Sequence, residues 1–226
     1  MTAKVNLDSP SRTEPSRGGE PLVDEADDAR ATLLLAHGAG APMDSAFLNV
    51  LAAGLGARRI RVVRFEFPYM DERRQRGTRA PPNRMPVLQE SFLARIAEAP
   101  RTLPLFIGGK SMGGRVATMI ADSVDVRGVL VFGYPFHPPK RADKLRVQHL
   151  SVLRARCLIV QGTRDALGSR EEVAGYALSG RVKLHWLEDG DHSFAPRRSS
   201  GRTSEQNLRE AIDTAARFML ARTRAE

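Results

Sequence analysis

A serine flanked by glycines is the residue pattern in this sequence that most directly indicates chemistry. Gly109-Lys110-Ser111-Met112-Gly113 matches G-x-S-x-G, the turn that presents a nucleophilic serine between a strand and a helix. The glycines are needed because such a sharp reversal strains the backbone at the serine and leaves no room for flanking side chains. We therefore predict that Ser111 is a nucleophile.

The same residues also resemble the end of a phosphate-binding P-loop. That motif, G-x-x-x-x-G-K-S, requires a glycine at position 104, where the sequence has Pro104. The residues between, Leu105-Phe106-Ile107, are typical of a strand rather than of a loop that wraps a phosphate. The spacing thus argues against nucleotide hydrolysis.

A nucleophilic serine needs a base and an acid that orients the base, and after this turn they follow in the order acid, then histidine. Asp165 follows the apolar run 156–161, and His192 lies in a polar loop after the run 182–187. Asp165 is also compatible with a turn or helix cap, while Asp191 adjoins the histidine too closely and Asp143 has no strand before it. We predict that Ser111 attacks a carbonyl, with His192 as base and Asp165 as acid.

The loop after the first apolar run is suited to bind an oxyanion through its backbone. Residues 32–36 are strand-like, and His37-Gly38-Ala39-Gly40-Ala41-Pro42 carries little side-chain bulk. We assign the oxyanion donors to the amides of Met112 and Ala39, with Gly40 as the alternative to Ala39.

Cofactor and metal motifs are not evident in the sequence. Gly38-Ala39-Gly40 begins like a dinucleotide motif, but the third glycine falls at Met43. The five histidines are not paired at H-x-x-x-H spacing, and the single cysteine, Cys157, excludes a C-x-x-C pair and an intrachain disulfide. We expect neither a cofactor nor a metal.

Four further residues are candidates for the substrate pocket: His37, Tyr69, Arg79 and Arg84. For His37 we favour the alternative that it supports its loop by a hydrogen bond. The arginine-rich stretch from 69 to 84 either favours acidic substrates at a strand end or is a solvated loop.

Length and composition are consistent with one compact enzyme. The chain has 226 residues, of which 42% are hydrophobic, enough for a single core. Residues 1–22, rich in Pro, Ser, Gly and acidic groups, are predicted to be a mobile tail before one domain over 23–226. No apolar stretch is long enough for a membrane span or typical of a signal peptide, and with one cysteine the cytoplasm is the expected compartment.

The net charge of +9 is unevenly distributed. Residues 1–30 hold four basic and seven acidic groups, which makes this segment −3 and the remainder +12. Such a surplus attracts anions or nucleic acid without specificity, but no nucleic-acid-reading motif accompanies it.

Strand-like and helix-like segments alternate along the chain. We predict a helix-free loop over 68–86, strands over 31–36, 60–67, 104–108, 128–132, 156–161 and 182–187, and helices over 45–56, 87–99, 112–123, 169–178 and 204–222. This order predicts an α/β fold, a mostly parallel sheet with helices on both faces and no large lid domain. The candidate residues then meet at the carboxyl edge of the sheet.

Four motifs together resemble a known family. The segments 37–45, 64–69, 108–115 and 190–194 look like a small cap-less branch of the α/β-hydrolase superfamily, similar to dienelactone hydrolases. This branch includes bacterial relatives of the testis-expressed and NSL-complex hydrolase-like proteins. The resemblance covers roughly 31–220 and implies a Ser-Asp-His site at Ser111, Asp165 and His192. Dienelactone hydrolases carry cysteine where this chain has Ser111, so their substrate does not transfer.

Three functions follow from these observations. The first is a serine hydrolase that cleaves a small carboxylic ester, lactone or thioester. The second is a protein with the hydrolase fold that acts as a binding scaffold, as some relatives in this branch are thought to do. The third is a nonspecific binder of nucleic acid through its basic surface. The sequence leaves the oligomeric state open.

Overall fold

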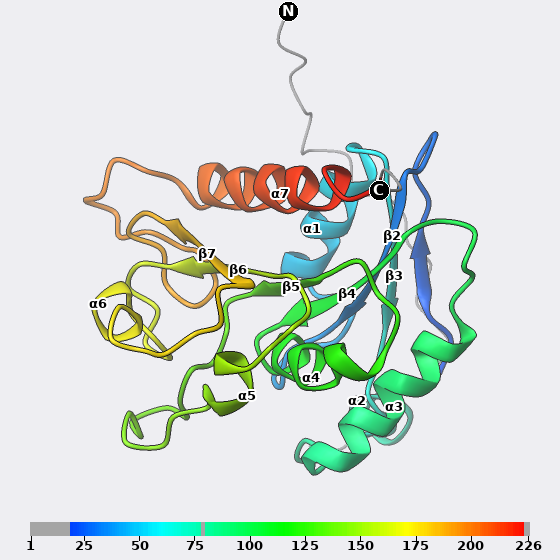
Figure 1. The fold of residues 1–226 in the computed structure, drawn as a ribbon, viewed down its shortest axis with the longest axis horizontal. Coiled ribbons are helices and arrows are strands. Elements are labelled where there is room, and N and C mark those ends of the chain that lie inside the picture. Colours follow the sequence, from blue (N-terminus) through cyan, green and yellow to red (C-terminus); the bar gives the residue numbers. More distant parts are fainter. Residues whose placement is uncertain (1–18, 78–79, 224–226) are drawn as a thin grey trace, which may run out of the picture.

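The computed structural model describes residues 19–77 and 80–223 and has one seven-stranded sheet at its centre (Figure 1). The strand order is β1-β3-β2-β4-β5-β6-β7, in which only β1 runs antiparallel to its neighbour. The strands are β1 (Leu22–Asp24), β2 (Ala31–Ala36), β3 (Ile60–Phe65), β4 (Leu105–Lys110), β5 (Val129–Phe132), β6 (Cys157–Gly162) and β7 (Val182–Leu187). The chain changes direction across the sheet between β2 and β4, the place where ligands bind in folds of this kind.

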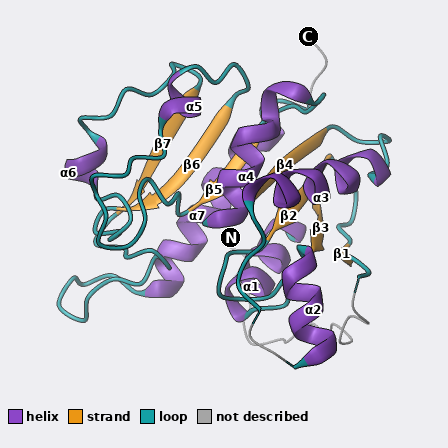
Figure 2. Cartoon of the chain, turned by 90° about the horizontal axis from the view of Figure 1, so that it is seen from below, coloured by secondary structure: helices purple, strands orange, loops and turns teal. Residues whose placement is uncertain are grey.

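Helices cover both faces of the sheet, as predicted (Figures 1 and 2). On one face lie α1 and α7, and on the other lie α2, α3 and α4. The helices are α1 (Ala46–Gly56), α2 (Pro68–Arg76), α3 (Met85–Glu98), α4 (Met112–Ile120), α5 (Gln148–Ser151), α6 (Arg170–Val173) and α7 (Ser204–Leu220), and a 3-10 turn spans Ala121–Ser123. The α/β architecture expected from the sequence is confirmed.

The central strands are apolar throughout because both of their faces are covered. In β2, Leu33 and Leu35 pack under α1 and α7, whereas Leu34 and Ala36 belong to the core on the opposite face. Alternating residues of one strand therefore join the two helical layers to one sheet.

Two elements of the first half were not predicted. Residues 22–24 form β1 on the edge of the sheet, so the tail expected over 1–22 includes the start of a strand; residues 1–18 lie outside the described part. Arg64 of β3 holds β1 through Nε and Nη2, which donate to the carboxylate of Asp24 at 2.8 and 2.9 Å. A three-residue strand held by a distant arginine has no local sequence signature.

The second unpredicted element is α2, which occupies part of the expected loop over 68–86. It begins at Pro68, whose ring suits the first helical turn, and buries Tyr69 and Met70. Arg74 anchors it by donating to the carboxylates of Glu66 and Asp44, at 2.6–3.1 Å. Because most of its other residues are charged or polar, α2 has no apolar periodicity that sequence analysis would detect.

No lid domain interrupts the described residues. The connection from β5 to β6 contains a single short helix, α5.

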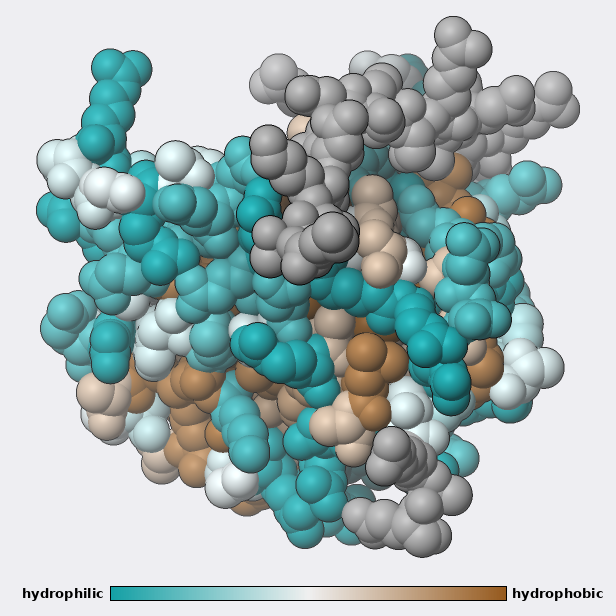
Figure 3. Space-filling model, turned by 90° about the horizontal axis from the view of Figure 1, so that it is seen from above, coloured by the Kyte–Doolittle hydropathy of each residue, from teal (hydrophilic) through white to brown (hydrophobic). Residues whose placement is uncertain are grey.

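No helix in the described ranges is long and apolar enough to cross a lipid bilayer. Hydrophilic groups predominate on the side seen in Figure 3, with smaller apolar areas between them.

Candidate active site

The turn at Ser111 has the backbone strain that its sequence predicts. Ser111 lies between β4 and α4 with φ 52° and ψ −113°, a conformation that side-chain-bearing residues rarely adopt. A Cβ on Gly109 would lie 2.7 Å from the carbonyl oxygen of Ala36, and one on Gly113 would lie 2.5 Å from that of His37. Glycine is thus required on both sides of the serine for α4 to pack against β2.

Hydrogen bonds join the three residues that the sequence singles out. Nε2 of His192 lies 2.9 Å from Oγ of Ser111, and Nδ1 of His192 lies 2.7 Å from Oδ2 of Asp165. Ser111 follows β4, Asp165 follows β6 and His192 follows β7, all at the carboxyl edge of the sheet. Because the carboxylate can only accept, Nδ1 carries a proton, and Nε2 of the neutral ring is free to accept the proton of the serine hydroxyl.

The carboxylate of Asp165 is fully buried and fully hydrogen-bonded. Its Oδ1 accepts the backbone N–H of Leu167 at 2.8 Å, and its Oδ2 accepts Nε2 of Gln161 at 2.8 Å. Gln161 also donates to the carbonyls of Tyr134 and Gly168. Gln161 was not predicted from the sequence, although a glutamine near the end of an apolar strand is a usable signal.

Lys110 is a second residue that the sequence analysis did not assign. Its Nζ donates to the carbonyl oxygen of His192 at 2.8 Å and lies 5.6 Å from the ring centre of Phe47. Burial lowers the pKa of Lys110 to about 8, and the carboxylates of Asp165 and Asp191 partly oppose this shift. The lysine therefore ties the end of β4 to the loop that carries His192.

The loop after β2 is held from behind by Tyr69. The Tyr69 hydroxyl lies 3.1 Å from the carbonyl oxygen of Gly38 and 3.0 Å from that of Ala39. In a trans peptide the carbonyl and the next N–H point in opposite directions, and no cis peptide occurs among the described residues. The N–H groups of Ala39 and Gly40 accordingly point away from Tyr69. The N–H of Met112 begins α4, where helix donors have no partner within the helix.

His37 supports the same loop. Its Nε2 accepts the backbone N–H of Phe67 at 3.1 Å, so its Nδ1 carries the proton and donates to the carbonyl oxygen of Gly38 at 2.6 Å. Burial lowers the pKa of His37, which keeps the ring neutral. This geometry corresponds to the supporting role considered for His37.

A cavity of about 410 Å³ opens above Ser111. Its walls include the loop 38–41 and the side chains of Phe47, Leu48, Lys110, Leu167 and His192. His37 and Tyr69 are not in this lining, because both are buried beneath the loop. Arg84 is exposed where α3 begins and does not line the cavity either; Arg79 lies outside the described residues. The pocket assignment of His37, Tyr69 and Arg84 is therefore corrected.

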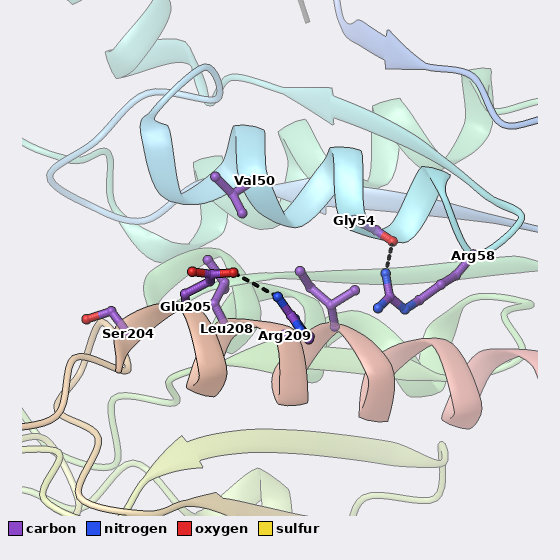
Figure 4. Close-up of a pocket in the computed structure, with 8 residues that line it drawn as sticks. Val50, Gly54, Arg58, Ser204, Glu205, Leu208 and Arg209 are labelled. Carbon is purple, nitrogen blue, oxygen red and sulfur yellow. Dashed lines mark hydrogen bonds and ion pairs between the residues drawn. The ribbon is translucent and has the colours of Figure 1, made fainter. Parts of the chain in front are cut away.

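A second hollow, of about 210 Å³, lies between α1 and α7 and shares no lining residue with the cavity at Ser111 (Figure 4). Its walls are mostly apolar, and its charged groups are engaged. Arg58 donates to the carbonyl oxygen of Gly54 at 2.7 Å, and Arg209 pairs with Glu205 at 2.8 Å. Within the described ranges no cluster of three metal-ligating side chains occurs, here or at Ser111.

Comparison with known proteins identifies the family. The model of the family described as alpha/beta hydrolase domain matches residues 29–220, and the chain belongs to that family. This match confirms the predicted superfamily, and the described residues contain no lid domain, in agreement with the predicted fold.

Solved structures share the fold at low sequence identity. The ferulic acid complex of Est1E from Butyrivibrio proteoclasticus matches with a TM-score of 0.67 and 14% identity, over 90% of this chain and 94% of that one. Dienelactone hydrolase from Anabaena variabilis matches with a TM-score of 0.66 and 19% identity, over 90% and 92%. A serine hydrolase without a lid from Xanthomonas campestris matches with a TM-score of 0.62 and 21% identity, over 87% of each chain.

Proposed function

We propose that this protein is a serine hydrolase that cleaves small carboxylic esters, lactones or thioesters through an acyl-enzyme. The observation that carries the proposal is the hydrogen-bonded series from Ser111 through His192 to Asp165 at the floor of an open cavity. The hydrolase names of structurally similar proteins support the same reaction class.

In the proposed first step, Oγ of Ser111 attacks the substrate carbonyl carbon while Nε2 of His192 takes the hydroxyl proton. The carbonyl oxygen becomes an oxyanion that accepts hydrogen bonds from the N–H of Met112 and from that of Ala39 or Gly40. His192 then gives its proton to the departing alcohol or thiol, which leaves an acyl group on Ser111. Throughout, Asp165 stabilises the imidazolium.

In the second step a water molecule replaces the leaving group. His192 takes a proton from that water, the resulting hydroxide attacks the acyl carbon, and the proton returns to Oγ of Ser111 as the acid leaves. The proposed steps use only side chains and backbone amides of this chain.

A fluorophosphonate probe tests the proposal, because it labels a serine only when a base activates it. We expect labelling at Ser111 that is lost in Ser111→Ala and His192→Ala and retained in the matched control Ser151→Ala, whose serine lies on α5. The labelled protein should also lose hydrolysis of short-chain esters. Absence of labelling on correctly folded protein would instead favour a binding role for the fold.

A further inference from the structure

Arg115 lies one helical turn after Ser111, on the side of α4 away from the sheet. The backbone N–H of Arg115 donates to the carbonyl oxygen of Ser111 at 3.0 Å, one helical turn away. Successive helix residues are rotated by about 100°, so Arg115 lies opposite Gly113, which faces β2. Side chains on a helix lean toward its N-terminus, which directs Arg115 toward the Ser111 turn.

Neutral groups surround this arginine on the neighbouring segments. The hydroxyl of Thr118 donates to the carbonyl oxygen of Arg115 at 2.8 Å and lies 3.0 Å from Nε2 of His149. The hydroxyl of Tyr134 donates to the carbonyl oxygen of Arg146 at 2.8 Å, and the charge of Arg115 acts on both Tyr134 and Arg146, so the second arginine lies near the first. Burial and the charge of Arg115 lower the pKa of His149 to about 4, so the imidazole is neutral at physiological pH.

Within the described residues, no counter-charge contacts the two guanidinium groups. Nε of Arg115 is buried and has no hydrogen-bond partner among the described residues. No described carboxylate forms an ion pair with Arg115 or Arg146, and the charge of Arg115 helps to lower the pKa of Arg146. Both residues are half-buried, and a guanidinium partly removed from water is normally paired, because an unpaired charge there is unfavourable. A ligand that brings an anion would supply the missing acceptor.

We propose that Arg115 and Arg146 form a subsite for a carboxylate or phosphate group of the substrate, outside the lining of the cavity at Ser111 but beside the helix that begins at that residue. The planar guanidinium presents two parallel donors that match two oxygens of either group. The inference rests on the proposed hydrolase function, and it specifies the substrate as an ester or thioester that carries a negative charge. On this inference, the arginines that favour acidic substrates are Arg115 and Arg146, whereas the sequence suggested those of the stretch 69–84.

The test compares substrates that differ only in charge. Mono-p-nitrophenyl esters of succinate, glutarate and adipate carry a free carboxylate at three distances, and each has a neutral counterpart in which that carboxylate is a methyl ester. For the preferred length we expect the ratio of kcat/KM, charged over neutral, to fall about 10- to 100-fold in Arg115→Gln and Arg146→Gln. Arg141→Gln removes an exposed arginine that pairs with Asp143 on the same connection and should leave the ratio unchanged. Ratios that do not change in any variant would overturn the subsite.

A binding measurement separates this inference from the hydrolase proposal. In the Ser111→Ala background, glutarate or inorganic phosphate should raise the melting temperature Tm relative to chloride at matched ionic strength. Adding Arg115→Gln should abolish that rise without lowering the Tm measured in chloride. A larger response to glutarate identifies a carboxylate site, and a larger response to phosphate identifies a phosphate site. If Ser111 proves inert but this response persists, only the hydrolase proposal fails; no response to either anion overturns the subsite.

Discussion

Arg64 and Arg115 are arginines with buried nitrogen atoms, but Arg115 is half-buried and the two side chains differ in their hydrogen-bond partners. Arg64 is 1% exposed, and its donors reach the carboxylate of Asp24, the carbonyl oxygen of Met43 and the side chain of Asn49, at 2.5–2.9 Å. Arg115 has a buried Nε without an acceptor and no described acidic neighbour in ion-pair contact. The first is a completed structural contact that holds an edge strand. The second has binding capacity that the fold does not use.

The proposed catalytic residues belong with Arg64 in this comparison. Both carboxylate oxygens of Asp165 accept hydrogen bonds, and both ring nitrogens of His192 are hydrogen-bonded. A side chain that makes all of its hydrogen bonds has a fixed orientation. For Arg64 this stabilises β1, and for Asp165 and His192 it maintains the geometry at Ser111. The following predictions test this distinction between paired and unpaired groups, starting with the largest effect.

The largest effect is expected from Asp165→Asn. The carboxamide can donate to Nδ1 of His192, which favours the ring form that carries its proton on Nε2 and cannot accept the serine proton. We expect turnover of a neutral ester to fall about 10⁴-fold while the variant remains folded. Steady-state kinetics with circular dichroism as the folding control measure this, and turnover within tenfold of the wild type would contradict the role given to Asp165.

Removal of the paired Arg64 should lower the stability of the protein, whereas removal of the unpaired Arg115 should not. Arg64→Met leaves the carboxylate of Asp24 without its partner and should lower the free energy of unfolding by about 3–5 kcal/mol. Arg115→Met removes an uncompensated charge and should not lower it. Urea denaturation of the two variants compares them directly, and equal losses would show that Arg115 is as much a structural residue as Arg64.

Acid should destabilise the protein partly through His149. The pKa of this histidine is lowered to about 4, so between this value and the ordinary 6.5 the unfolded chain binds a proton that the folded chain does not. Because of His149, the free energy of unfolding should therefore fall as the pH drops below 6.5, by about 2 kcal/mol at about pH 5. Urea denaturation at pH 7.5 and 5 should reveal a smaller loss in His149→Gln; an identical loss would exclude His149 as its source.

The smallest expected effect concerns Lys110. In Lys110→Met the loop of His192 loses its hydrogen bond to β4, and kcat should fall about 10-fold with little change in KM. Lys144→Met, at an exposed position, is the control. Because the folded pKa is about 8 and the unfolded value is about 10.4, wild-type stability should rise between these pH values, and this rise should be absent in Lys110→Met. An unchanged kcat would contradict the proposed contact.

The strands and long helices were predictable because their apolar residues recur with a clear period. Strands 31–36 and 182–187 have the predicted bounds, and Thr203 and Gln206 form the capping box that begins α7. The helix expected over 169–178 is reduced to α6. The polar helix α2 and the edge strand β1 were missed, since contacts with residues far away in the sequence stabilise them.

The sequence indicates which strand-end residues meet, but not which other residues line the cavity. Ser111, Asp165 and His192 each follow a strand of a parallel sheet, so strand order alone brings them to one edge. Arg84 and Tyr69 also follow a strand-like segment, but α2 turns the chain, burying Tyr69 and carrying Arg84 away from the cavity. Position along the chain does not specify the direction in which a loop side chain points.

The sequence by itself determined the parallel α/β sheet, the strained turn at Ser111 and the identity of the three residues that meet there. These features follow from residue periodicity and from backbone sterics, which act locally. Only the tertiary structure decided which polar groups are paired. It shows that Tyr69 and His37 hold the loop 37–42, that Gln161 and Lys110 support the site, and that Nε of Arg115 has no hydrogen-bond partner among the described residues. The partner of a buried polar group often comes from a segment far away in the sequence, and only tertiary packing decides which segments come into contact.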